Sequence, residues 1–178
     1  TEAKDNFSLA IKFDEHPGET IIANMPEDHV SAGVHYFQQT VRMSTYLVAF
    51  AFGELQSKKT TTESGVEVGV FATKAHQPKE LDFALGIAKQ AIEFYEKFYQ
   101  TPYPLPHSWQ LALPDFSAGA MENWGLVTYR EAYLLLDPDN TSLDMKRLVA
   151  TVITHELAHQ WFGDLVTMIC GLTKALIT

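Results

Sequence analysis

The chain has 178 residues, of which 46% are hydrophobic and 20% are charged, a composition typical of a globular protein with a sizeable core. Its formal net charge of −9 argues against a nucleic-acid or anionic-membrane surface, because either partner would be repelled over most of the chain. The single cysteine, Cys170, excludes an internal disulfide framework and agrees with a reducing compartment, so we expect a cytoplasmic protein. The sequence contains no apolar run long enough to span a bilayer.

The beginning of the chain has the pattern of antiparallel β structure. Residues 7–13 alternate apolar residues with others, which is the period of a strand with one buried face. Further strands are predicted over residues 20–23, 35–42 and 45–52. The last of these is so apolar that we expect it inside a sheet or between layers.

A polar stretch follows this β region. Residues 56–65 contain no large apolar residue, which predicts a hairpin loop or an inter-domain connection. We therefore expect two units, a β unit over residues 1–56, which the family resemblance given below implies to be the C-terminal part of an N-terminal β domain, and a second domain over residues 57–178. The fold class that this order of elements predicts is α+β.

The second unit begins with a strand, a helix and another strand. The first strand is predicted over residues 66–73, and Pro78 then opens a helix whose apolar residues repeat at helical spacing until the proline-rich stretch that begins at Thr101. Residues 109–113 predict a short strand. An aromatic stripe along such a helix indicates core packing.

Residues 155–159 read His-Glu-Leu-Ala-His within a predicted helix that begins near residues 140–144 and is stopped by Gly163 after Phe162. Residues four apart lie on one helix face, so His155 and His159 can direct two imidazole nitrogens at one zinc ion. Glu156 can reach a water molecule on that metal and accept its proton during attack on a carbonyl. The implied chemistry is amide hydrolysis.

The alternative interpretation is an ordinary helix with a solvated Glu156. The helix carries an apolar stripe that would place the two histidines at the edge of a buried face; its members are Leu148, Val149, Val152, Ile153, Leu157 and Ala158. Buried polar groups need partners, and a metal would supply one. The five histidines outside the motif have no spacing that joins them to it, so we expect surface or structural positions for His16, His29, His35, His76 and His107.

A segment rich in small residues, 115–127, precedes the metal motif. Small residues allow a backbone to approach a ligand closely, and an extended segment could pair with a peptide as an added strand. Glu122 is its acidic group. Taken alone, the segment could equally be a surface loop with a solvated glutamate.

Gly119-Ala120-Met121-Glu122-Asn123 followed by His155-Glu156-Leu157-Ala158-His159 resembles the M1 family of zinc aminopeptidases, the gluzincin group, and most closely its bacterial, lactic-type members. Residues 43–50 resemble the end of that family's N-terminal β domain, and residues 159–167 resemble the exit from its metal-binding helix. The resemblance implies the first part of a thermolysin-like zinc peptidase domain preceded by a β domain. It also implies peptide substrates with a free N-terminus.

The same resemblance implies a role for each motif residue. His155 and His159 would bind one Zn²⁺ per complete site, and Glu156 would deprotonate the zinc-bound water that attacks the scissile carbonyl. Glu122 would hold the free α-amine, since an amine with a pKa of about 8 is largely cationic at neutral pH. The rest of the substrate-binding segment would line the first residues of the peptide: Gly119, Ala120, Met121 and Asn123.

The end of the chain departs from the family pattern. The family's third zinc ligand, a glutamate, is expected near Thr178, and threonine is a poor zinc ligand. Residues 169–178 also lack the tryptophan-rich pattern of the family. The remainder of the catalytic domain and a C-terminal helical domain would lie outside this chain.

Two other functions remain open from the sequence. A zincin-type endopeptidase needs the same zinc helix but no amine anchor, so Glu122 distinguishes the two. Alternatively, the chain is a non-catalytic fragment that lacks the third zinc ligand and is weak or inactive by itself. Cys170 is a less favoured substitute ligand, because a lone cysteine is usually a small buried hydrophobe.

Overall fold

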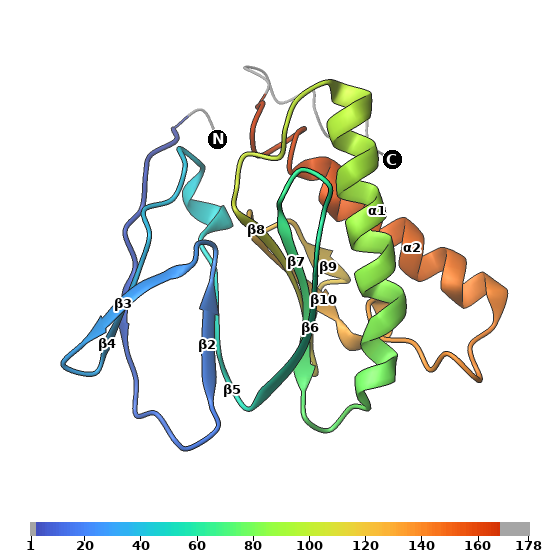
Figure 1. Cartoon of the computed structure of the whole chain (residues 1–178), viewed down its shortest axis with the longest axis horizontal. Coiled ribbons are helices and arrows are strands. Elements are labelled where there is room, and N and C mark those ends of the chain that lie inside the picture. Colours follow the sequence, from blue (N-terminus) through green and yellow to red (C-terminus); the bar gives the residue numbers. More distant parts are fainter. Residues whose placement is uncertain (1–2, 168–178) are drawn as a thin grey trace.

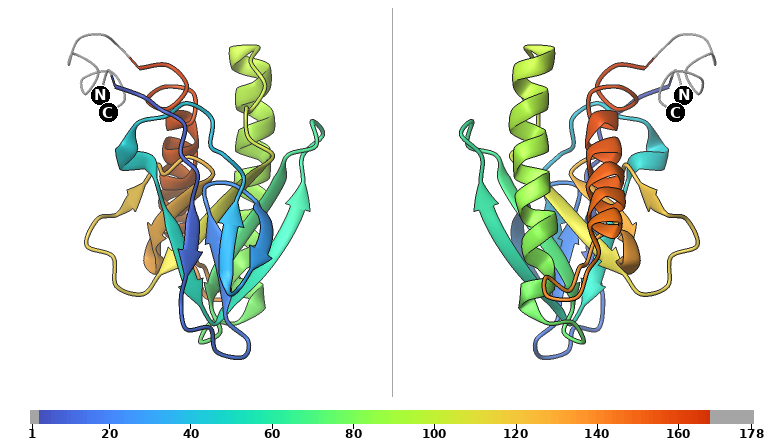
Figure 2. Two further views of the ribbon diagram at one scale, coloured as in Figure 1. Left: turned by 90° about the vertical axis from the view of Figure 1, so that its left-hand side faces the viewer. Right: turned by 90° about the vertical axis from the view of Figure 1, so that its right-hand side faces the viewer.

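The structure is a computed structural model that describes residues 3–167. Its strands form an N-terminal β layer and a larger mixed sheet, and two helices cover the face of the sheet that is turned away from that layer (Figure 1). The two helices run beside each other along this face (Figure 2). Among the described residues, no helix has the length and apolar character needed to cross a bilayer.

The N-terminal β layer consists of two small antiparallel sheets. The first has the order β1-β4-β3, with bounds Ala10–Lys12, Val34–Phe37 and Glu27–Ser31. The second pairs β2 (Thr20–Ala23) with β5 (Phe50–Gly53). Antiparallel β structure in this part of the chain is thus confirmed, and β2 has the predicted bounds.

Other predictions in this layer were wrong in extent or type. The strand predicted over residues 7–13 is only three residues long, and β4 ends well before Arg42. The strand predicted over residues 45–52 begins as a 3-10 helix, η1 (Thr45–Leu47), and the side chains of Phe50 and Phe52 are each 52% exposed rather than interior. Here β5 belongs to a two-stranded sheet, and its residues alternate between exposed and half-buried.

The larger sheet has the order β6-β7-β8-β10-β9. The bounds are Leu55–Thr61, Glu67–Thr73, His107–Leu113, Leu126–Arg130 and Ala120–Met121, in that order. The three central strands β7, β8 and β10 run parallel, while β6 and β9 are antiparallel edge strands. Of these central strands, β7 and β8 are buried along most of their length, as expected for parallel strands with covered faces.

The polar stretch 56–65 is not a loop, contrary to the prediction. Most of it is the edge strand β6, which pairs with β7 through its backbone, and only residues 62–65 form the turn of the hairpin. An edge strand can leave polar side chains in water while its main chain is paired, so polarity alone did not exclude a strand. The domain boundary predicted at residues 56 and 57 falls at the start of β6 and stays a prediction.

The helices agree closely with the sequence pattern. A 3-10 helix, η2 (Pro78–Leu81), leads into α1 (Asp82–Tyr99), and the left-handed Gln100 ends α1. In α2 (Leu143–His159), the Ser142 hydroxyl caps the N-terminus by accepting from the Met145 N–H at 3.2 Å. A third 3-10 helix, η3 (Glu131–Tyr133), follows β10.

Two details of α2 differ from the prediction. The helix ends at His159 rather than Phe162, because the next residues turn back and the Asp164 N–H donates to the His159 carbonyl at 3.1 Å. Leu148 is exposed rather than part of the buried stripe. The main core lies between the sheet and the two helices and includes Val68, Val70, Ile92, Val127, Tyr129, Val149, Ile153 and Leu157.

Candidate functional site

Two imidazoles converge at the last turn of α2. The Nε2 atoms of His155 and His159 are 3.1 Å apart, and the ring planes meet at 88°. Two nitrogens that each lie about 2.0–2.1 Å from a zinc ion at a tetrahedral angle are separated by roughly 3.3 Å. The helical spacing therefore places the two nitrogens at the separation of two ligands of one zinc ion.

Hydrogen bonding prepares His159 for the ligand role. Its Nδ1 lies 3.1 Å from the carbonyl oxygen of Phe162, an acceptor, so the proton belongs on Nδ1 and the lone pair on Nε2. Burial, followed by the neighbouring His159, lowers the pKa of His155 and favours its neutral form. Neutral imidazole is the form that binds metals.

A complete ligand set is not present in the described part of the chain. Within residues 3–167, no group of three or more His, Cys, Asp or Glu side chains is arranged to hold a metal ion. The position expected for the third ligand, Thr178, and the less favoured Cys170 both lie outside the described residues. The pair of histidines fits two corners of a zinc site.

Glu156 points into the protein rather than into solvent. The residue is only 7% exposed, which contradicts the interpretation of Glu156 as a solvated helix residue. Burial, followed by repulsion from Glu122, raises the pKa of Glu156 to about 7. A carboxyl group that titrates near neutral pH beside the two imidazoles suits proton transfer.

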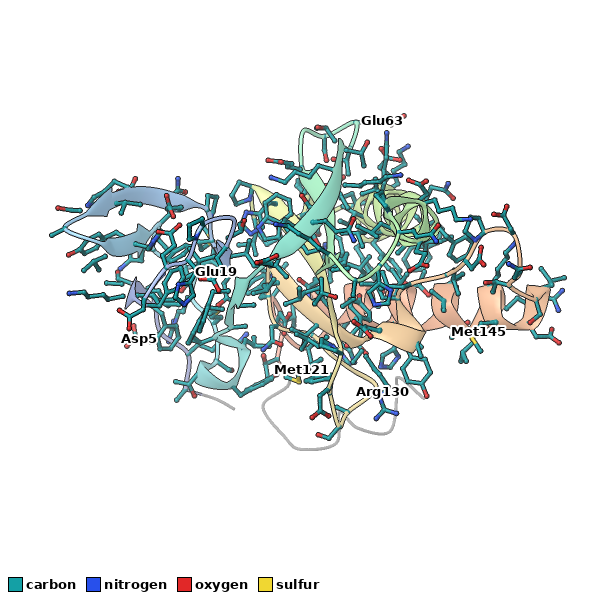
Figure 3. The ribbon with its side chains drawn as sticks, turned by 90° about the horizontal axis from the view of Figure 1, so that it is seen from below. Asp5, Glu19, Glu63, Met121, Arg130 and Met145 are labelled. Atoms are coloured by element: carbon teal, nitrogen blue, oxygen red, sulfur yellow. The ribbon has the colours of Figure 1, made fainter. Side chains whose placement is uncertain are left out.

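The segment of residues 119–123 lies at the edge of the larger sheet. Its strand β9 pairs with β10 through Met121 opposite Thr128 and Ala120 opposite Tyr129. Since β9 is the last strand of this sheet in the described part of the chain, its outer edge can accept an extended peptide. Figure 3 shows Met121 and Arg130 on the same side of the molecule.

The surface-loop interpretation does not fit residues 119–123, although Asp115, Ser117 and Ala118 before them are exposed and irregular. Asn123 is buried, its amide nitrogen donates to the Leu47 carbonyl at 3.4 Å, and its amide oxygen accepts from the Thr128 hydroxyl at 3.2 Å. Gly119 packs against the Tyr133 ring, which a Cβ at this position would approach to 3.3 Å. The segment is therefore fixed on both the sheet and the N-terminal β layer.

Sequence reasoning missed two buried polar residues beside the site. Gln160 follows His159 directly and is wholly buried, and its amide nitrogen donates to the Asp164 carboxylate at 3.1 Å. Burial, followed by repulsion from Glu122, raises the pKa of Asp164 to about 9. The sequence carried no burial signal for Gln160, because its other side-chain partners, Tyr103, Glu122 and Gly125, are far away along the chain.

The site has an acidic character that extends to the N-terminal β layer. Glu122, Glu156 and Asp164 are close enough for Glu122 to raise the pKa of the other two. Tyr46 of η1 has its pKa raised to about 12, first by burial and then by Asp164 and Glu122. A divalent cation or an ammonium group bound beside these carboxyl groups would favour their ionised forms.

Comparison with known proteins identifies relatives of the chain. Residues 83–170 match the peptidase family M1 domain. Aminopeptidase N of Lactobacillus delbrueckii subsp. lactis is 78% identical over 167 residues, which cover 94% of this chain and 20% of that protein. Aminopeptidase N of Lactobacillus helveticus is 79% identical over 168 residues, covering 94% and 20%.

A more distant relative shares the same region. Endoplasmic reticulum aminopeptidase 1 of Mus musculus is 46% identical over 170 residues, which cover 93% of this chain and 18% of that protein. The chain thus spans about a fifth of the length of the curated relatives it matches. These matches confirm the family resemblance seen in residues 119–123 and 155–159.

Proposed function

The chain belongs to peptidase family M1, and we propose that the protein from which it comes is a zinc aminopeptidase that removes the N-terminal residue of peptides. One observation carries this proposal: the Nε2 atoms of His155 and His159 converge to 3.1 Å beside the buried carboxyl group of Glu156. The names of the related aminopeptidases support the same reaction.

His155 and His159 would hold the zinc ion together with a third ligand from outside the described residues. Zinc, when bound, acts as a Lewis acid that polarises the scissile carbonyl and acidifies the attacking water. The orientation of His159 is set by the hydrogen bond from its Nδ1 to the Phe162 carbonyl. Such a partner keeps the imidazole in the tautomer that presents Nε2.

Glu156 acts as the general base. Its carboxylate takes a proton from the attacking water and passes it to the nitrogen of the leaving amine, which completes amide hydrolysis. A pKa near 7 suits both steps, because the group can accept and release a proton at neutral pH. Burial also keeps bulk water away from this proton transfer.

Glu122 binds the α-ammonium group of the substrate. An ion pair between this carboxylate and the amine places the first peptide bond of the substrate toward the metal helix, so one residue is removed at a time. The open edge of β9, with Gly119 and Ala120 at its start, would pair with the backbone of the first substrate residues. Glu122 thus separates an aminopeptidase from an endopeptidase built on the same helix.

The chain as given supplies two of the three expected protein ligands within its described residues. We therefore propose that it is weak or inactive by itself and that activity needs the remaining parts of the protein. A cytoplasmic location, suggested by the single cysteine, is part of the same proposal.

The proposal is tested with a Glu122→Ala variant of the full-length protein. Hydrolysis of an unblocked aminoacyl p-nitroanilide should fall about 100-fold or more. The cationic amine loses its partner, and the scissile bond is no longer held in position at the metal site. Glu122→Gln keeps the shape of the side chain without its charge and serves as the matched variant. Zinc content, measured by atomic absorption, should stay unchanged in both.

A comparison of a free substrate with its N-acetylated form decides between an exopeptidase and an endopeptidase. The wild-type protein should cleave the free aminoacyl amide and leave its N-acetylated form intact. Equal cleavage of both forms by the wild type would contradict the aminopeptidase assignment and favour a zincin-type endopeptidase. Chelator-sensitive turnover at a normal rate by the isolated chain would contradict its assignment as an incomplete site.

A further inference from the structure

Gln160 connects the two halves of the site through its side chain. Its amide nitrogen donates to the Glu122 carbonyl at 3.1 Å and to the Asp164 carboxylate at 3.1 Å. Its amide oxygen accepts from the Tyr103 hydroxyl at 3.1 Å and from the Gly125 N–H at 3.4 Å. A side-chain amide has two N–H donors and two acceptor lone pairs, so every one of them is used.

The chemistry of these partners fixes the orientation of the amide. The Glu122 carbonyl can only accept a hydrogen bond, and the Gly125 N–H can only donate one. A flipped amide would place its oxygen against the carbonyl and its N–H₂ group against an N–H, which is repulsive on both sides. Gln160 is therefore held in one arrangement.

The position of Gln160 in the chain gives this arrangement a consequence for the reaction. It is the C-cap of α2 and directly follows His159, while its side chain holds the main chain of Glu122. The backbone of the amine-binding residue is thus tied to the residue next to a metal-binding imidazole. A shift of about 1 Å between such groups can cost about 100-fold in rate.

No other described hydrogen bond links the main chain of Glu122 to the last turn of α2. The N–H of Gly125 lies at a buried contact and the carbonyl of Glu122 at a partly buried one, and loss of the amide would remove the partner of each. The segment would then move to find new partners, and the Glu122 side chain would move with it. The imidazoles, held by the helix and by the Phe162 carbonyl, would stay.

We propose that Gln160 is a positioning residue that sets the distance between the amine-binding Glu122 and the metal-binding histidines, and thereby the preference for a free N-terminus. This inference rests on the proposed aminopeptidase function. Gln160 touches neither the substrate nor the metal in this role. It acts through the main chain of residues 122–125.

The test uses Gln160→Met in the full-length protein, because methionine has a similar length and no amide. Two substrates are compared: an aminoacyl p-nitroanilide and its desamino analogue, which has hydrogen in place of the amine. The ratio of their kcat/KM values should fall about 10- to 100-fold in the variant, mainly through the free-amine substrate. Zinc content should remain one per protein.

Gln110 provides the matched control. It is also a wholly buried glutamine, its amide nitrogen donates to the Ser108 hydroxyl, and its amide oxygen accepts from the Tyr129 hydroxyl. None of its described hydrogen bonds reaches residues 119–125. Gln110→Met should lower thermal stability and leave the substrate ratio at its wild-type value.

A second variant covers the case in which Gln160→Met does not fold. Gln160→Asn keeps a polar amide but is one methylene shorter, so it cannot reach the Glu122 carbonyl and the ratio should fall here too. An unchanged ratio in a folded, zinc-loaded Gln160 variant would overturn the proposal. A wild-type protein with no preference for the free amine would instead overturn the proposed function.

Discussion

Two regions of the protein hold the same four residues, 122–125, through one buried amide each. From the N-terminal β layer, the Asn24 amide nitrogen donates to the Trp124 carbonyl and to the Leu47 carbonyl, both at 2.8 Å. Its amide oxygen accepts from the Ala49 N–H at 2.7 Å. From α2, Gln160 holds the carbonyl of Glu122 and the N–H of Gly125.

The two amides differ in what else they join. The other partners of Asn24 belong to its own layer, so it fastens that layer to the segment. Gln160 follows His159, which we propose as a zinc ligand, and connects the segment to the end of α2. If the proposed function holds, similar hydrogen bonding serves stability in one region and substrate register in the other.

The largest expected effect concerns α2, which carries His159. His159→Ala in the full-length protein removes one zinc ligand, and activity should fall on the order of 1000-fold because several kcal/mol of metal-derived stabilisation are lost. Zinc content by atomic absorption and turnover of the free aminoacyl amide measure this. His29→Ala, on the exposed strand β3 of the N-terminal layer, is the control and should change neither. Full zinc content in His159→Ala would show that the imidazole pair is not the metal site.

The second effect concerns the point at which the two regions meet. Gly125 has a φ of +86°, and a Cβ there would lie 2.2 Å from the Asn24 carbonyl oxygen. Gly125→Ala should therefore destabilise the protein by about 3 to 5 kcal/mol, measured by urea unfolding. Gly86→Ala, at an open position inside α1, is the control and should stabilise slightly. Equal stability of the two variants would contradict the close approach.

The third effect is a dependence on pH at the contact between the layer and the sheet. Burial lowers the pKa of His107 to about 4, and the backbone of Ala23 and Asn24 acts in the opposite direction. The unfolded chain binds this proton below about pH 6.5 and the native protein only below about pH 4. The contribution of His107 to the free energy of unfolding is therefore at its maximum above about pH 6.5. It falls by up to about 3 kcal/mol as the pH drops to 4.

His107→Phe tests this window. The phenyl ring can keep the stacking on Trp109, whose ring centroid lies 4.1 Å from that of His107, but it cannot titrate. Urea unfolding between pH 7 and pH 4 should show a smaller loss of stability in the variant than in the wild type. His16→Gln, at an exposed position, should behave as the wild type. Identical pH profiles for His107→Phe and the wild type would remove His107 as the cause.

The smallest effect sharpens the comparison of the two amides. Asn24→Leu should destabilise the full-length protein by about 2 kcal/mol, because buried main-chain groups lose their partners. The ratio of kcat/KM for the free-amine and desamino substrates should stay near that of the wild type, unlike in Gln160→Met. A drop of this ratio as large as that of Gln160→Met would show that both regions set the substrate register.

Regular elements with a local signal were predictable from the sequence. The apolar repeat and Pro78 located α1, and the capping residues among 140–144 located the start of α2, because propensity and capping act over a few neighbouring residues. The strand β6 was missed because its polar side chains resemble a loop until a partner strand is known. The strand β3 was missed as well, and all its residues are exposed.

In the candidate site, too, the features with a local sequence signal were predictable. A spacing of four residues on a helix was enough to expect that His155 and His159 converge, and the structure places their Nε2 atoms 3.1 Å apart. The burial of Glu156 was not predictable from its helix alone, since it depends on what packs against that face. The same holds for Asp164, whose raised pKa comes first from burial.

The sequence by itself determined the reactive groups and their local spacing: two histidines one helical turn apart, an acid between them and a second acid in a segment of small residues. Only the tertiary structure decided how these pieces face one another. Gln160 meets Glu122 across 38 positions of sequence, and Asn24 meets Trp124 across 100. No local pattern encodes such a contact, because its energy arises only when folding removes both partners from water and leaves each as the other's hydrogen-bonding group.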